Sequence, residues 1–454
     1  MDTNLAHLTI ADALDLLMSG VLTKKELIGA YLDRINEFEP DINAFIQLCP
    51  VDEMTVDDQP ERIRKSLDGI PLAVKDLIDV AGLPTTAGSP GFFGSEPANR
   101  DSLVVERIKM AGGVIIGKTH THEIALGVTG INPHFAPTRN PRALDRIPGG
   151  SSSGSAAAVA AGMCLGALGT DTGGSIRIPA ALCGVVGLKP TYGRVSTRGV
   201  LPLSWYLDHV GPITHTVRDA AILLGVLAGH DPQDLMSVDT PLEDYLSSIN
   251  GGIRGWNIAL AVGDYFEDIH PDVGKAYIQT EAAIEALGAR ISRMDMSWLE
   301  QAVQATVLMI TADAAAYHRE RLEESPEVFG VDVRKRLEMG RSYSVTEYVL
   351  ARRIKAELTH KMKGFFTEFD LLVTPTVPVP APLIEGTDSL AQARLLNRFT
   401  TPFNLTGLPA LSIPCGITPE GLPIGLQLVG GAWQEAKILR AGHTLENTLG
   451  VRYE

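Results

Sequence analysis

The sequence predicts an α/β fold, in which helices cover the faces of a parallel or mixed β-sheet. The main observation is that short apolar segments, typical of buried strands, alternate with longer helical segments in the C-terminal half. The second is size: with 454 residues, 45% of them hydrophobic, the chain can form one large α/β domain or two to three domains. Strands are expected at 258–262, 371–373, 411–413 and 425–429, and helices at 276–287 and 435–449.

The N-terminal half begins with helices. Residues 1–48 are expected to be helical because Thr9 and Thr23 each open a capping pattern, with Asp12 and Glu26 three residues later. The further expected elements are a strand at 69–75, a helix at 101–111, a strand at 114–116, a helix and a strand within 155–168, a loop at 203–212 and a helix from 216 to 228.

The composition excludes several classes of protein. A net charge of −15, from 54 acidic and 39 basic residues, argues against a nucleic-acid-binding surface over the whole molecule. The most apolar stretch, 155–168, is too short to span a membrane, and no signal peptide is expected at the N-terminus. Cys49, Cys164, Cys183 and Cys415 are scattered, which predicts buried thiols in a reducing compartment and a cytoplasmic protein.

Two clusters of glycine and serine, 149–155 and 169–175, stand out in the middle of the chain. Their composition would also suit a flexible linker. However, the helix-forming segment 156–161 directly follows the first cluster, which disfavours a linker. Glycine lets the backbone approach a ligand closely, and N–H groups at the start of a helix stabilise negative charge. We therefore expect both clusters at a binding or catalytic site.

The residues alone leave three interpretations of these clusters open. Residues 150–154 match the Gly-x-Ser-x-Gly elbow of α/β-hydrolase esterases with Ser152 as nucleophile, but a loop precedes them where a strand is required. Alternatively Ser175 is the nucleophile, with the N–H groups of 172–175 stabilising an oxyanion and a pair of Asp171 and Arg177 bracing the turn. The third interpretation is a structural glycine turn.

Lys75 ends the predicted strand 69–75, directly after Leu-Ala-Val, so its stem is expected to be buried. A buried lysine has a lowered pKa and can act as a base. A structural ion pair with Asp76 or Asp79 is the alternative, and the local pattern leaves both open.

Two other motifs are rejected on physical grounds. Residues 112–119 match the P-loop formula, but the middle of the motif, Val-Ile-Ile, is a strand rather than a flexible loop. His120, His122 and Glu123 could begin a metal site like that of zinc deaminases, but no Pro-Cys-x-x-Cys segment follows. Histidines hydrogen-bonded near a cleft are favoured instead.

Together, Lys75, the 149–155 cluster and the segment 169–179 resemble the amidase signature family. The resemblance is strong over 65–230 and continues more weakly to the end of the chain. It implies a single domain with a mixed, many-stranded sheet between helices. Its expected parts are a helical N-terminal arm at 1–64, the signature core at 65–230, and the remaining sheet, helices and substrate pocket at 231–454.

The resemblance also implies the roles of individual residues in a Ser–cis-Ser–Lys triad. Ser175 would be the nucleophile, Ser151 the bridging serine after a cis peptide bond, and Lys75 the base. The N–H groups of Thr172, Gly173, Gly174 and Ser175 would form the oxyanion hole. No metal or other cofactor would be needed.

The implied reaction is hydrolysis of a linear carboxylic amide or carbamoyl-type C–N bond to an acid plus ammonia or an amine. Within the family, the alternative is the glutaminase component of a tRNA-dependent amidotransferase. Such glutaminases commonly carry Leu-Asp-Gln where this chain has Leu207-Asp208-His209, and an acidic residue near the position of Asn397. Both departures favour a stand-alone amidase.

Candidate substrate-binding residues are Asn132, Trp205 and Tyr206. Arg336 could bind an acidic substrate group or lie on the surface. The expected partner is a small-molecule amide, aryl, aliphatic or urea- or urethane-like, with no direct contact to nucleic acid or membrane; a homodimer is one option for the assembly. A non-catalytic scaffold protein is disfavoured because all three triad residues are present.

Overall fold

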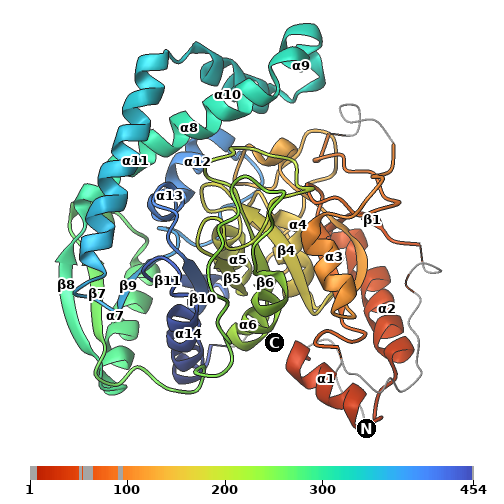
Figure 1. The fold of residues 1–454 in the computed structure, drawn as a ribbon, viewed down its shortest axis with the longest axis horizontal. Helices are drawn as coiled ribbons and strands as arrows, with labels where there is room; N and C mark the ends of the chain where they lie inside the picture. The colour runs from red at the N-terminus through yellow and green to blue at the C-terminus, as the bar shows by residue number, and fades with distance from the viewer. Residues whose placement is uncertain (1–7, 51–53, 55–64, 90–95, 452–454) are drawn as a thin grey trace.

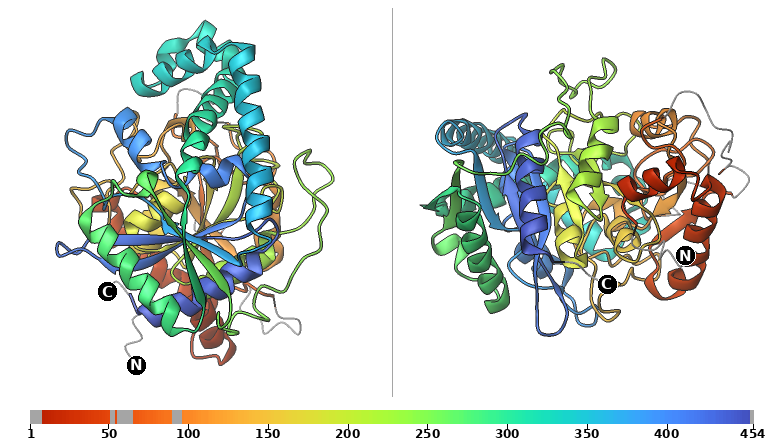
Figure 2. Two further views of the ribbon diagram at one scale, coloured as in Figure 1. Left: turned by 90° about the vertical axis from the view of Figure 1, so that its left-hand side faces the viewer. Right: turned by 90° about the horizontal axis from the view of Figure 1, so that it is seen from below.

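One eleven-stranded β-sheet runs through the computed structural model, which describes residues 8–50, 54, 65–89 and 96–451. The strand order is β1-β3-β2-β4-β6-β5-β10-β11-β9-β7-β8. The right panel of Figure 2 shows how this order carries the chain from the red N-terminal side across to the green α7 side. The strands are β1 (Phe45–Leu48), β2 (Pro71–Lys75), β3 (Val114–Thr119), β4 (Gly166–Asp171), β5 (Val186–Lys189), β6 (His209–Thr214), β7 (Asn257–Val262), β8 (Arg290–Asp295), β9 (Leu371–Pro375), β10 (Ala410–Ile417) and β11 (Pro423–Val429).

The sheet is mixed. Strands β2, β3 and β4 are parallel to one another, as are β7, β8 and β9, and antiparallel pairs connect these two groups through β6, β5, β10 and β11. Strands such as β2 and β4 are buried at every residue, as expected where helices cover both faces of a sheet. The predicted α/β class and the mixed sheet between helices are therefore confirmed.

The helices lie in two layers around the sheet (Figure 1). Neighbouring residues of β10 illustrate this, because Leu411 faces α14 while Ser412 faces α5. The helices are α1 (Ile10–Met18), α2 (Lys24–Ile42), α3 (Leu103–Met110), α4 (Ser153–Ala160), α5 (Arg177–Cys183), α6 (Val217–Leu227), α7 (Pro271–Ala286), α8 (Gln301–Tyr317), α9 (Arg319–Glu324), α10 (Val331–Ser342), α11 (Val345–Phe365), α12 (Ser389–Leu396), α13 (Thr401–Leu405) and α14 (Glu435–Leu449).

Helices α8 to α11 form an extension that stands above the sheet (Figure 1, and the left panel of Figure 2). Helix α8 packs against α10, α11 and α13, so it joins the extension to the body of the molecule. Met309 of α8, Leu337 of α10 and Leu358 of α11 share a hydrophobic cluster with Leu77, which directly follows β2. This cluster brings the extension over the end of β2.

Two predicted segments differ from the structure. Residues 45–48, expected to be helical, form β1 and pair antiparallel with β3 at the edge of the sheet. The expected loop at 203–212 ends in β6, which pairs with β4 along its whole length. Gly211 and Pro212 are typical of loops, but Gly211 is required here because a Cβ atom would meet the carbonyl oxygen of Leu188.

Other expectations are confirmed. Thr9 and Thr23 form the capping boxes of α1 and α2. The four cysteines are buried thiols. Within the described ranges, no helix is both long and apolar enough to cross a bilayer.

Candidate active site

Lys75 lies at the C-terminal end of β2 and is fully buried. Its Nζ is 2.8 Å from Ser151 Oγ and 2.7 Å from Thr170 Oγ1. The alternative ion pair with Asp76 is not formed, because Asp76 pairs with Lys118 on the neighbouring strand β3. Burial lowers the pKa of Lys75 to about 7, although the charges of Asp171 and Asp208 oppose this shift.

Ser151 follows a cis peptide bond with Gly150, at the position where the family resemblance implied one. Its carbonyl oxygen accepts a hydrogen bond from the N–H of His122. The neighbouring Ser152 is a different kind of residue: its hydroxyl donates to the carbonyl oxygen of Thr170 and accepts from the N–H of the same residue, each at 3.2 Å. The first serine cluster is thus tied to the end of β4.

Ser175 lies in the turn between β4 and α5, and it is 6% exposed. Its carbonyl oxygen accepts a hydrogen bond from the N–H of Ser152, so the two serine clusters are adjacent. Among the described residues, no hydrogen bond joins the hydroxyls of Ser151 and Ser175. The two hydroxyls therefore lie on neighbouring turns without direct contact.

The turn presents unused donors. In the described part of the chain, the N–H groups of Thr172, Gly173, Gly174 and Ser175 donate no hydrogen bond, whereas buried N–H groups are almost always paired. Gly174 has φ +138°, and a Cβ atom there would meet Thr400 Oγ1. The same Thr400 hydroxyl donates to the carbonyl oxygen of Gly173 at 2.6 Å. The geometry leaves a ring of free donors beside Ser175.

A buried ion pair braces this turn, as expected from the sequence. Arg177 binds Asp171 through two hydrogen bonds of 3.0 and 2.9 Å, and both side chains are fully buried. Arg177 also donates to Gln427 of β11 and to Asn404 of α13, each at 2.6 Å. Burial opposes ionisation of Asp171, but the charge and hydrogen bonds of Arg177 hold its pKa below the usual range.

Asp208 supports the other side of the turn. Its carboxylate accepts a 2.6 Å hydrogen bond from the hydroxyl of Thr172 and two more from the N–H groups of Leu203 and Ser204. Burial raises the pKa of Asp208 to about 6, although the hydrogen bond from Thr172 opposes the shift. Sequence reasoning noted this residue only as part of a departing motif. Its role depends on β6, which was expected to be a loop.

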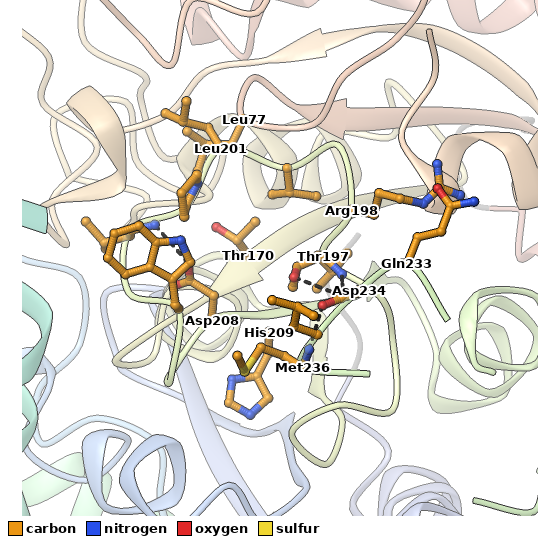
Figure 3. Close-up of a pocket in the computed structure, with 16 residues that line it drawn as sticks. Leu77, Thr170, Thr197, Arg198, Leu201, Asp208, His209, Gln233, Asp234 and Met236 are labelled. Carbon is orange, nitrogen blue, oxygen red and sulfur yellow. Dashed lines mark hydrogen bonds between the residues drawn. The ribbon is translucent and has the colours of Figure 1, made fainter. Parts of the chain in front are cut away.

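A cavity of about 270 Å³ adjoins the site. Thr170 lines it between Leu77 and Leu201 on one side and His209 on the other, as Figure 3 shows. Because Thr170 also binds Lys75, the cavity reaches the site from the lysine side. Ser175 is not among its lining residues.

The predicted substrate-binding residues are dispersed. Trp205 lines the cavity of Figure 3, and Tyr206 lines a separate groove beside α11. Asn132 is buried and donates to the carbonyl oxygens of Gly88 and Thr121, so it supports loops rather than lining either space. Arg336 is 7% exposed and donates to Ser389, which rules out the surface position considered for it.

The histidine motif is structural. His122 lies 3.2 Å from Asp332 of α10, and Glu123 accepts hydrogen bonds from Ser89 and from the N–H of Gly330. His120 packs edge-on against Phe135. These contacts join the extension to the segment that holds Ser151.

Comparison with known proteins agrees with the arrangement of these residues. The family model described as amidase matches residues 26–439. The chain belongs to the amidase family. As a member, this amidase is an enzyme that hydrolyses amide C–N bonds.

Its relatives include both amidases and components of glutamyl-tRNA(Gln) amidotransferases. It is 37% identical to the A chain of the glutamyl-tRNA(Gln) amidotransferase of Halothermothrix orenii, over 99% of this chain and 98% of the relative. It is 39% identical to an amidase of Pseudomonas putida, over 98% and 96%.

Solved structures show the same fold. The corresponding amidotransferase chain from Thermotoga maritima has a TM-score of 0.86 at 34% identity, covering 98% of this chain and 96% of that one. A 6-aminohexanoate cyclic dimer hydrolase complexed with substrate has a TM-score of 0.90 at 29% identity, covering 99% and 98%.

The buried ion pair yields a test of stability. Replacing Arg177 by Met leaves Asp171 buried without its counter-charge, so the free energy of unfolding should fall by about 3–5 kcal/mol. Denaturant unfolding of the Arg177→Met variant measures this. Arg353→Met is the control, because Arg353 is an exposed residue paired only with Glu357. An equal effect of the two substitutions would contradict the bracing role.

Proposed function

We propose that this amidase acts through an acyl-enzyme on Ser175, with Ser151 as proton relay and Lys75 as general base. The observation that carries the proposal is the position of a fully buried lysine 2.8 Å from Ser151 Oγ, on a turn adjacent to Ser175 and its four free N–H groups. A serine hydroxyl is a weak nucleophile and needs such a base.

The first half-reaction follows from the donors and acceptors present. The lone pair of neutral Lys75 takes the Ser151 proton, while Ser151 takes the Ser175 proton and Ser175 Oγ bonds to the amide carbon. The free N–H groups of 172–175 stabilise the oxyanion that forms. As the C–N bond breaks, the relay returns a proton to the leaving nitrogen, which departs as ammonia or an amine. Water then attacks the ester by the same route and releases the acid.

The electrostatics suit this role for Lys75. A lysine of ordinary pKa is protonated at neutral pH and cannot accept a proton. With a pKa of about 7, a large fraction of Lys75 is neutral under physiological conditions. The hydroxyl of Thr170 fixes the amine while its lone pair remains available to Ser151.

The elbow interpretation with Ser152 is disfavoured by its hydrogen bonds. The Ser152 hydroxyl is fully buried and engaged with both backbone groups of Thr170. It serves to hold the first cluster on β4, so we assign no nucleophilic role to it.

For the substrate, we propose a small, uncharged amide. The groups nearest Gly173 are uncharged: Ile310, Thr401 and Asn397, whose Oδ1 lies 3.6 Å from the position of a Cβ atom on Gly173. The ammonium of free glutamine would have no carboxylate at Asn397. The second candidate is a glutaminase that acts with partner proteins. It is supported by the near-complete coverage of the amidotransferase relatives at 37–40% identity.

The nucleophile is tested by paired substitutions. Ser175→Ala should abolish hydrolysis of a chromogenic amide, whereas Ser152→Ala should retain turnover. Lys75→Met should lower kcat by about 10²–10⁴, the usual contribution of general base catalysis. Turnover by Ser175→Ala together with loss in Ser152→Ala would instead support the elbow.

The pH dependence of kcat/KM reports Lys75. Because only neutral Lys75 accepts the proton, kcat/KM should rise with pH through about 7 and level off above it. The negative charge of Asp208 favours the protonated lysine, so Asp208→Asn should move this rise to lower pH. A rise that stays in place or moves to higher pH would contradict the assignment.

The two candidate functions differ in their response to glutamine. The chain alone should hydrolyse uncharged amides faster than glutamine. Asn397→Asp should increase the ratio of kcat/KM for glutamine to that for a neutral amide, because it adds a counter-charge for the ammonium. Glutaminase activity that appears only with added partner proteins would reverse the preference for a stand-alone enzyme.

A further inference from the structure

A second hollow lies outside the catalytic cavity, between α11 and α8. It has a volume of about 490 Å³. Four of its lining residues come from one face of α11 and are basic: Arg352, Lys355, His360 and Lys363. Their spacing of three to five residues brings them to the same side of the helix. In the described part of the chain no acidic residue lines the hollow, although the whole chain carries a net charge of −15.

These basic groups lack counter-ions. Among the described residues none of the four forms an ion pair, whereas Arg353, the next residue on the helix, binds Glu357 at 2.8 Å. Asp313, the nearest acidic group to Lys355, is already engaged by Ser204 and Tyr348. The charge facing the hollow is therefore not neutralised by the described residues.

Lys355 is the central member of the row. It is half-buried, and its Nζ has one hydrogen bond, 3.3 Å to the carbonyl oxygen of Tyr206. An ammonium carries three donors, so two remain for a ligand. Burial, together with the nearby charge of Arg352, lowers the pKa of Lys355 to about 8, which an anion in the hollow would reverse.

The rest of the lining is apolar or aromatic. Met309 and Ala356 contribute aliphatic surface, and the guanidinium of Arg352 lies 5.4 Å from the ring centre of Tyr206. A planar apolar group fits beside this ring, while a negative group reaches the basic row. Inorganic phosphate would meet the charges but leave the apolar surface unused.

We propose that this groove is a binding site for a small organic acid, a carboxylate with an apolar or aromatic body. The site is separate from the catalytic cavity, because the two share no lining residue. It nevertheless touches the same loop: Tyr206, held by Lys355, lies two residues before Asp208, which supports the turn of Ser175. The proposal concerns binding and does not depend on the catalytic role of Ser175.

Isothermal titration of the Ser175→Ala protein with phenylacetate tests the proposal, since this background excludes turnover. We expect saturable binding that weakens with added salt, and much weaker binding of phenylethanol and inorganic phosphate. The double substitution Arg352→Met and Lys355→Met should weaken phenylacetate binding by about tenfold or more, the value of one charge-assisted hydrogen bond. Arg353→Met, on the neighbouring face of α11, should leave it unchanged.

Each other outcome overturns the site. Affinity that survives the double substitution would place the acid in the catalytic cavity. Phosphate binding as tight as phenylacetate would remove the role of the apolar surface, and no saturable binding would exclude the groove altogether. If the double variant fails to fold, Lys363→Glu, which reverses an exposed charge at the rim, should still weaken binding.

Discussion

The buried ion pair between Arg177 and Asp171 is the interaction on which the candidate site depends. Burying two charges is costly unless every donor and acceptor is satisfied. Here the guanidinium binds the carboxylate with two hydrogen bonds and reaches Gln427 and Asn404 with its remaining N–H groups. The pair thereby joins the turn after β4 to β11 and α13. A glycine-rich segment that would otherwise be mobile is held with its N–H groups unused.

The same sheet shows how a lysine becomes a base. Lys75 and Lys118 lie on adjacent parallel strands, and both are fully buried. Lys118 has the carboxylate of Asp76 at 2.8 Å, whereas Lys75 contacts the hydroxyls of Ser151 and Thr170. Burial without a contacting counter-ion lowers the pKa of Lys75 to about 7. The difference between a structural and a reactive lysine is one carboxylate.

Much of the fold could be predicted from the sequence, because long apolar strands and capped helices are local signals. Lys75, Ser151 and Ser175 could be singled out because their motifs resemble a family. Thr170 and Asp208 could not, because their contacts arise from pairing between strands distant in sequence. β6 was hidden by Gly211 and Pro212, whose loop-like character is overridden by close packing against Leu188. Asn132 was misjudged since nothing local reveals that its amide is consumed by two carbonyl oxygens.

The account rests on Ser175 being the activated hydroxyl, and covalent labelling tests this most directly. Reaction with a fluorophosphonate, followed by peptide mass spectrometry, identifies the serine that carries the phosphonyl group. The account predicts a single adduct on Ser175, formed at a rate that rises with pH through about 7 as Lys75 loses its proton. An adduct on Ser152, or labelling that persists in Ser175→Ala, would contradict it.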